Sequence, residues 1–141
     1  MHNVPLFSSF NIKSKTLRNR IVLSPMCQYK AKDGKISEWH LQHYSRFAFS
    51  GLGAAFIEAT GVSPEGRIGH GCTGIWSDDH IDGLSKIAKV FKEYNCVSGI
   101  QLAHAGRKAS FLRPWDGASP ITKDDTIEPA WQTIGPSAIP I

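Results

Sequence analysis

The stretch IVLSPMCQY, residues 21–29, places polar and reactive side chains directly behind a short apolar run. Its first three residues predict a buried strand, and the Ser-Pro step that follows marks the end of that strand. The thiol of Cys27 and the phenol of Tyr29 are therefore expected at the carboxyl end of a strand. In parallel α/β proteins, that end is where functional groups gather.

Two further apolar runs are also predicted to be strands with polar side chains near their ends. Residues 54–57 predict a second strand, which is expected to end in Glu58, Ala59 and Thr60. Residues 97–102 predict a third strand, which carries Gln101 near its end. The sequence therefore predicts three strands that deliver polar groups to one side of a sheet.

Helix signals lie between these strands. Residues 38–50 predict a helix, with Ser37 as its N-cap and Gly51 as its stop. Residues 79–94 predict a second helix, because their apolar side chains recur at helical spacing: Ile81, Leu84, Ile87, Ala88 and Phe91.

A hairpin is predicted ahead of the first strand, from two β-prone pieces at residues 6–12 and 16–17. The order hairpin, strand, helix, strand, helix, strand indicates an α/β fold with parallel strands joined by right-handed crossovers. The irregular residues 105–141 are expected to form an ordered excursion over a strand end, with a small hairpin of their own.

Composition narrows the class of protein. The 141 residues are 41% hydrophobic and 20% charged, which is typical of one globular domain, and we treat residues 1–141 as one partial domain without a second. A net charge of +4 spread along the chain argues against nucleic acid as a partner. Three cysteines without paired spacing, no signal peptide and no long apolar run favour a soluble cytoplasmic protein without membrane contact.

Each candidate site residue also has a purely structural interpretation. Cys27 alone is more often a small buried apolar side chain, and Tyr29 could simply close a loop. The amide of Gln101 suits a carbonyl or imide edge of a ligand, but it could equally cap neighbouring backbone groups. His104 and Arg107 could bind an anion, although loop contacts are favoured for Arg107.

Other polar residues carry no predicted chemistry. His40 and His43 are three residues apart but lack a third ligand, so packing and hydrogen bonding to the sheet is favoured and no metal site is predicted. Cys72 and Cys96 are expected to be structural. The glycine-rich residues 61–74 lack a phosphate-binding fingerprint and are expected to form a conformational loop.

Several ordered motifs together resemble the N-terminal part of the old yellow enzyme family, closest to its branch of xenobiotic reductases and YqjM-like enzymes. They are LRNRIV (residues 17–22), SPMCQY (24–29), EAT (58–60) with PEGR (64–67), GIWSD (74–78) and GIQLAHAGRK (99–108). The resemblance covers nearly the whole chain.

The resemblance implies the N-terminal portion of a TIM (β/α)8 barrel, with about three of its strands, that holds FMN at the strand ends. It also implies ping-pong hydride transfer from NADPH or NADH to activated C=C bonds of enones and related α,β-unsaturated acceptors. By position, the flavin would be lined by Ser24, Pro25, Met26, Cys27, Ala59 and Gln101, Cys27 would tune its potential, and Tyr29 would face the substrate.

The sequence departs from the family in its length. A TIM barrel needs roughly 250 residues, and this sequence stops at Ile141, before a fourth strand and before the family's substrate-binding and phosphate-binding residues. We therefore expect the chain to form homo-oligomers or to need the C-terminal half of the barrel. The alternative is a non-catalytic remnant that acts as an interaction or oligomer-forming module.

Overall fold

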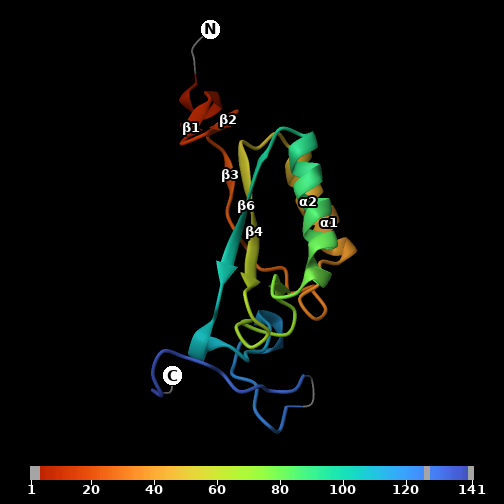
Figure 1. Cartoon of the computed structure of the whole chain (residues 1–141), viewed down its shortest axis with the longest axis vertical. Coiled ribbons are helices and arrows are strands. Elements are labelled where there is room, and N and C mark those ends of the chain that lie inside the picture. The colour runs from red at the N-terminus through yellow and green to blue at the C-terminus, as the bar shows by residue number, and fades with distance from the viewer. Residues whose placement is uncertain (1–3, 126–127, 140–141) are drawn as a thin grey trace.

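The computed structural model describes residues 4–125 and 128–139. Its parallel sheet contains β3 (Val22–Leu23), β4 (Ala54–Gly61), β5 (Thr73–Gly74) and β6 (Val97–Ala103). Strand β4 is central: β6 pairs along one edge, while β3 and β5 pair with the start and the end of the other edge. Because all these pairings are parallel, the strands run in one direction, and β4 and β6 end at the same side of the sheet (Figure 1). The segment that follows β3 continues toward that side, where the backbone N–H of Gln28 reaches Glu58.

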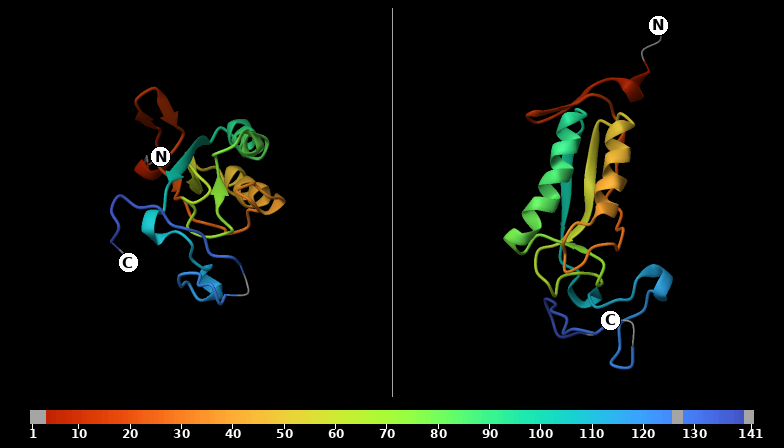
Figure 2. Two further views of the ribbon diagram at one scale, coloured as in Figure 1. Left: turned by 60° about the horizontal axis from the view of Figure 1, so that its bottom comes forward. Right: turned by 90° about the vertical axis from the view of Figure 1, so that its right-hand side faces the viewer.

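Two helices, α1 (Glu38–Phe49) and α2 (Ile81–Glu93), lie side by side on one face of the sheet (Figure 2). The core fills the space between helices and sheet. It consists of Leu23, Tyr44, Ala48, Ala55, Ile57, Ile87, Phe91 and Cys96. No described helix covers the opposite face. The predicted alternation of strands and helices is therefore confirmed, and so is the structural role expected for Cys96.

The ends of the helices follow from local chemistry. Helix α1 begins after Ser37, whose side chain and backbone both contact the ring of His40, and it stops before Gly51, which has a φ of 87°. Helix α2 begins two residues later than predicted, because residues 78–80 form a separate 3-10 turn capped by Ser77. Its lysines at 86, 89 and 92 are exposed, as the helical spacing indicates.

The second predicted strand ends close to the expected place. Strand β4 ends at Gly61, one residue beyond the expected end in Glu58, Ala59 and Thr60, and its polar side chains find buried partners. The hydroxyl of Thr60 lies 3.0 Å from the hydroxyl of Thr73 on β5. Strand β5 is only two residues long and lies inside the glycine-rich segment, where no strand was expected.

The predicted hairpin is confirmed as the antiparallel pair β1 (Phe10–Ile12) and β2 (Lys15–Leu17). Figure 1 shows it at the amino-terminal end of the parallel strands, opposite the carboxyl ends. The described part of the chain after Ala105 lies at those carboxyl ends. It contains one isolated antiparallel bridge, between Phe111 and Pro120, in place of the small hairpin that was predicted. Among the described helices, none has the length and apolarity needed to cross a membrane.

Candidate functional site

The carboxyl ends of β3, β4 and β6 bring most of the predicted site residues to one region. Residues 24–29 leave β3 there, with Met26 53% exposed and Cys27 and Tyr29 half-buried. Ala59 of β4 pairs in register with Gln101 of β6, so these two residues are neighbours across the strands. Gln101 is exposed, and no described residue hydrogen-bonds its amide. Its predicted alternative role, capping nearby backbone groups, is not seen in this part of the chain.

A β-bulge decides which face each residue of β4 uses. The register between β4 and β6 shifts between Ile57 and Ala59, where one extra residue is inserted. A bulge re-aims side chains, so two consecutive residues can be buried under the helices. Ile57 packs in the core and Glu58 contacts helix α1, whereas Ala59 is half-exposed. Glu58, one of the polar groups expected at the strand end, therefore lies under α1 instead.

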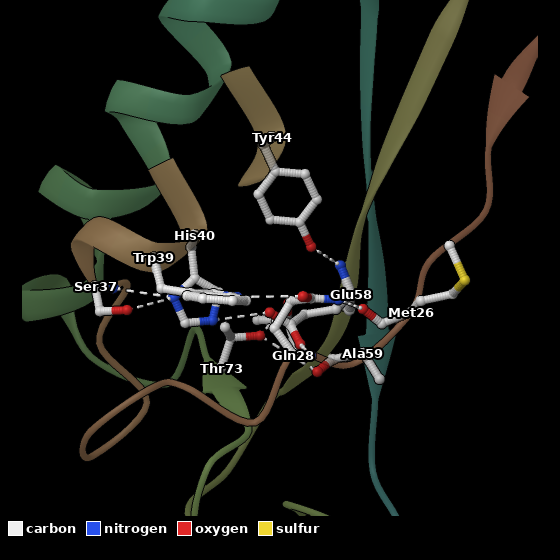
Figure 3. Close-up of polar contacts among 10 residues, drawn as sticks. Met26, Gln28, Ser37, Trp39, His40, Tyr44, Glu58, Ala59 and Thr73 are labelled. Atoms are coloured by element: carbon white, nitrogen blue, oxygen red, sulfur yellow. Dashed lines mark hydrogen bonds and ion pairs between the residues drawn. The ribbon is translucent and has the colours of Figure 1, made fainter. Parts of the chain in front are cut away.

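Figure 3 shows the polar contacts around Glu58, which is fully buried. Its Oε1 lies 2.9 Å from Nε2 of the fully buried His40, and its Oε2 accepts a hydrogen bond from the backbone N–H of Gln28. The backbone N–H of Glu58 donates to the hydroxyl of Tyr44 at 2.8 Å. Glu58 therefore links α1 to the segment that carries Cys27.

The predicted preference for packing over metal binding is consistent with the contacts of both histidines. The ring of His40 contacts Ser37 and Glu58. The ring of His43 packs edge-on against those of Tyr44 and Phe47, at centroid distances of 5.0 and 5.1 Å. Within residues 4–125 and 128–139, no three histidine, cysteine or acidic side chains gather as a possible metal site.

The thiol of Cys27 interacts with that of Cys72, a residue of the glycine-rich segment. Hydrogen bonding to Cys72 raises the pKa of Cys27 far above its ordinary value, and burial and the charge of Glu58 add to this effect. The same bond lowers the pKa of Cys72, assisted by the backbone of Gly69 and Ile68. Cys27 is therefore the thiol that keeps its proton. Cys72 is buried, as a structural cysteine would be, and it also influences Cys27.

Tyr29 lies two residues after Cys27 and is half-buried. Burial raises its pKa to about 12, with contributions from the neighbouring cysteines, so its hydroxyl stays protonated near neutral pH. Its φ of 52° lies in the left-handed region, which is uncommon for a bulky residue. Its ring packs edge-on against that of Trp115, at a centroid distance of 5.7 Å. The loop-closing interpretation and a ligand-facing role are thus compatible.

Arg107 and His104 make the loop contacts that were favoured for Arg107. The guanidinium of Arg107 donates to the hydroxyl of Ser137 at 2.9 Å, and Nδ1 of His104 accepts from the backbone N–H of Gly106. Sequence reasoning missed two features of the site, the Glu58–His40 pair and the Cys27–Cys72 pair. Both join residues far apart along the chain, and no spacing rule connects them.

Comparison with known proteins extends this description. Residues 5–133 match the model of the NADH:flavin oxidoreductase / NADH oxidase family. An NADPH dehydrogenase of Geobacillus thermodenitrificans is 45% identical over 134 residues, which cover 88% of this chain and 39% of that relative. An NADPH dehydrogenase of Bacillus subtilis is 50% identical over 106 residues, which cover 74% of this chain and 31% of that relative.

A solved structure agrees with the sequence relatives. The old yellow enzyme homologue from Zymomonas mobilis superimposes with a TM-score of 0.70 at 28% identity, over 75% of this chain and 30% of that one. This likeness confirms the predicted fold class, the N-terminal portion of a TIM (β/α)8 barrel with a β-hairpin. The chain spans well under half the length of these relatives. It belongs to the NADH:flavin oxidoreductase / NADH oxidase family, in its old yellow enzyme branch.

Proposed function

We propose that this chain supplies the flavin-facing strand ends of an FMN-dependent NAD(P)H oxidoreductase that reduces activated C=C bonds. The acceptors would be enones and related α,β-unsaturated electrophiles. The observation that carries the proposal is the register of Ala59 beside Gln101 at the carboxyl ends of β4 and β6, next to the segment of residues 24–29.

The residues at these strand ends fit a flavin. A flat ring needs small side chains against it, and Ala59 is small and half-exposed. The amide of Gln101 can donate and accept at once, as the pyrimidine edge of the ring requires, and no described residue occupies it. Exposed Met26 offers an apolar, polarisable surface, and Ser24 and Pro25 complete the exit from β3.

FMN, when bound, supplies hydride transfer between a nicotinamide and the acceptor. The chain's own residues would orient the flavin and the acceptor and would tune the flavin's reduction potential. The thiol of Cys27 retains its proton because its pKa is raised, so it can act as a neutral hydrogen-bond donor beside the ring. The hydroxyl of Tyr29 also keeps its proton, with a pKa raised to about 12, and can donate to a carbonyl oxygen of the acceptor. Both are assigned here as catalytic residues.

A second candidate function rests on the sheet face that no described helix covers. Val22 and Phe56 alternate with the core residues Leu23, Ala55 and Ile57, and are 44% and 39% exposed. An apolar surface of this kind favours association. The second function is therefore a non-catalytic module that associates through this face.

Flavin titration combined with size exclusion separates the two functions. The redox function predicts that the protein binds FMN, that NADPH bleaches the flavin absorbance under anaerobic conditions, and that 2-cyclohexenone restores it. Cys27→Ala should retain binding but shift the flavin reduction potential. A colourless oligomer with no affinity for FMN would instead support the association module.

A further inference from the structure

The most deeply buried ionisable group near the site is the carboxylate of Glu58. Carboxylates are almost never fully buried unless they are paired. Here one oxygen lies 2.9 Å from Nε2 of His40, and the other accepts from the backbone N–H of Gln28. Neither His40 Nε2 nor Glu58 Oε1 makes a well-aligned hydrogen bond to any described residue, so each is the other's partner by proximity.

The contacts of His40 with Ser37 show which of its ring nitrogens carries the proton. Its Nδ1 accepts the backbone N–H of Ser37 at 3.1 Å and lies 2.9 Å from the Ser37 hydroxyl. An imidazole nitrogen that accepts a hydrogen bond carries no proton, so the ring proton is on Nε2 and faces Glu58. The first turn of α1 therefore presents a donor to one oxygen of the carboxylate, and residue 28 presents a donor to the other.

The turn held by this carboxylate has an unfavourable backbone conformation. Tyr29 has a φ of 52°, and such conformations persist only where the surroundings over-determine them. The side chain of Gln28 makes hydrogen bonds only to exposed residues among those described. Its NH2 group donates to Met26 O at 2.9 Å, and its oxygen accepts from Trp39 Nε1 at 3.2 Å. The bond from the Gln28 N–H to Glu58 is thus the one that reaches a fully buried partner.

We propose that Glu58, supported by His40, is a positioning residue that fixes the turn between Cys27 and Tyr29. Because Gln28 lies between these two residues, its anchored N–H sets the direction in which the thiol and the phenol leave the strand. What Cys27 and Tyr29 then do rests on the proposed function, whereas the anchoring of the turn does not.

The isosteric change Glu58→Gln separates this role from simple packing. An amide of the same shape can offer its oxygen to His40 or to Gln28 but not to both, and its NH2 group then faces the other donor. Packing is preserved while one of the two acceptors is lost. Tyr44→Phe is the matched control, because it removes the partner of the Glu58 backbone N–H and leaves the carboxylate intact.

Site-resolved alkylation by iodoacetamide, followed by peptide mass spectrometry, is the test. Cys27 reports on the turn, and Cys96, which is 4% exposed in the core, reports on the fold. Because removing the charge of Glu58 by itself lowers the pKa of Cys27, the rates are compared per thiolate, after the thiolate fraction has been taken from the pH profile of alkylation. In Glu58→Gln, this corrected rate at Cys27 should rise while Cys96 stays protected. Tyr44→Phe should leave the rate of Cys27 near that of the wild type.

Three results would overturn the proposal: an unchanged corrected rate at Cys27 in Glu58→Gln, an equal rise at Cys96, or an equal rise at Cys27 in Tyr44→Phe. If Glu58→Gln does not fold, amide hydrogen exchange of the wild-type chain decides. The N–H of Gln28 should exchange slowly although it belongs to a loop, and exchange at the rate of an exposed amide would contradict the anchor. No readout involves FMN, so failure of the proposed function is distinguishable.

Discussion

The thiols of Cys27 and Cys72 interact, and each is the largest influence on the pKa of the other. The segments that carry them run alongside each other, since the backbone N–H of Ala31 donates to the carbonyl of Gly71 at 3.0 Å. The glycine-rich segment is therefore a wall of the candidate site. It determines the protonation state of the thiol that we assign to the flavin.

Replacing Cys72 should change the acidity of Cys27. Cys72→Ala removes the hydrogen bond that raises the pKa of Cys27, so that pKa should fall and Cys27 should react faster with iodoacetamide at a fixed pH. The control is Cys96→Ala, the same change at a core position remote from this pair. The pH dependence of alkylation at Cys27 is the measurement, and an identical profile in both variants would contradict the coupling.

Gly71 should tolerate no side chain. A Cβ at this position would lie 2.7 Å from Cα of Tyr29 and closer still to its carbonyl, and backbone atoms cannot move aside cheaply. Gly71→Ala is therefore expected to destabilise the fold by about 1–3 kcal/mol. At Gly135 an added Cβ meets its nearest atom at 3.6 Å, so Gly135→Ala should be near neutral. Urea midpoints of the two variants provide the comparison, and equal midpoints would exclude the close packing described here.

Stability should fall as the pH falls through 6.5, the ordinary value for histidine, because of His43. Burial, together with the charge of Arg46, lowers the pKa of His43 in the folded state. The unfolded chain then binds the proton more tightly, so the contribution is present above pH 6.5 and is lost below it. Urea unfolding above and below this pH should show a smaller loss in His43→Gln than in the wild type. An equal loss in both proteins would show that other groups cause it.

Local signals explain which parts of the fold could be predicted. The Ser37 cap, the Gly51 stop and the apolar spacing of Ile87 and Phe91 act within a few residues, and the helices they predict are present. The burial of Glu58 was missed because a carboxylate normally signals solvent. Glu58 stays inside only because His40, on a different element, supplies a partner.

The candidate site, like the fold, could be predicted only in part. The strand ends that carry Cys27, Ala59 and Gln101 could be read from apolar runs and from the resemblance to a known family. The thiol of Cys72 could not, because it reaches Cys27 only after the glycine-rich segment folds back on residues 27–31. Contacts of this kind depend on the tertiary fold rather than on spacing.

The most direct measurement of the central claim is a titration of FMN fluorescence with the wild-type chain and two variants. Ala59→Leu enlarges the side chain at the proposed flavin face, and Ala88→Leu makes the same change at an exposed position of α2. We expect saturable quenching by the wild type and by Ala88→Leu, with affinity weakened at least about tenfold in Ala59→Leu, a loss of about 1.4 kcal/mol. Equal affinity in both variants, or no saturable binding by the wild type, would contradict a flavin site at these strand ends.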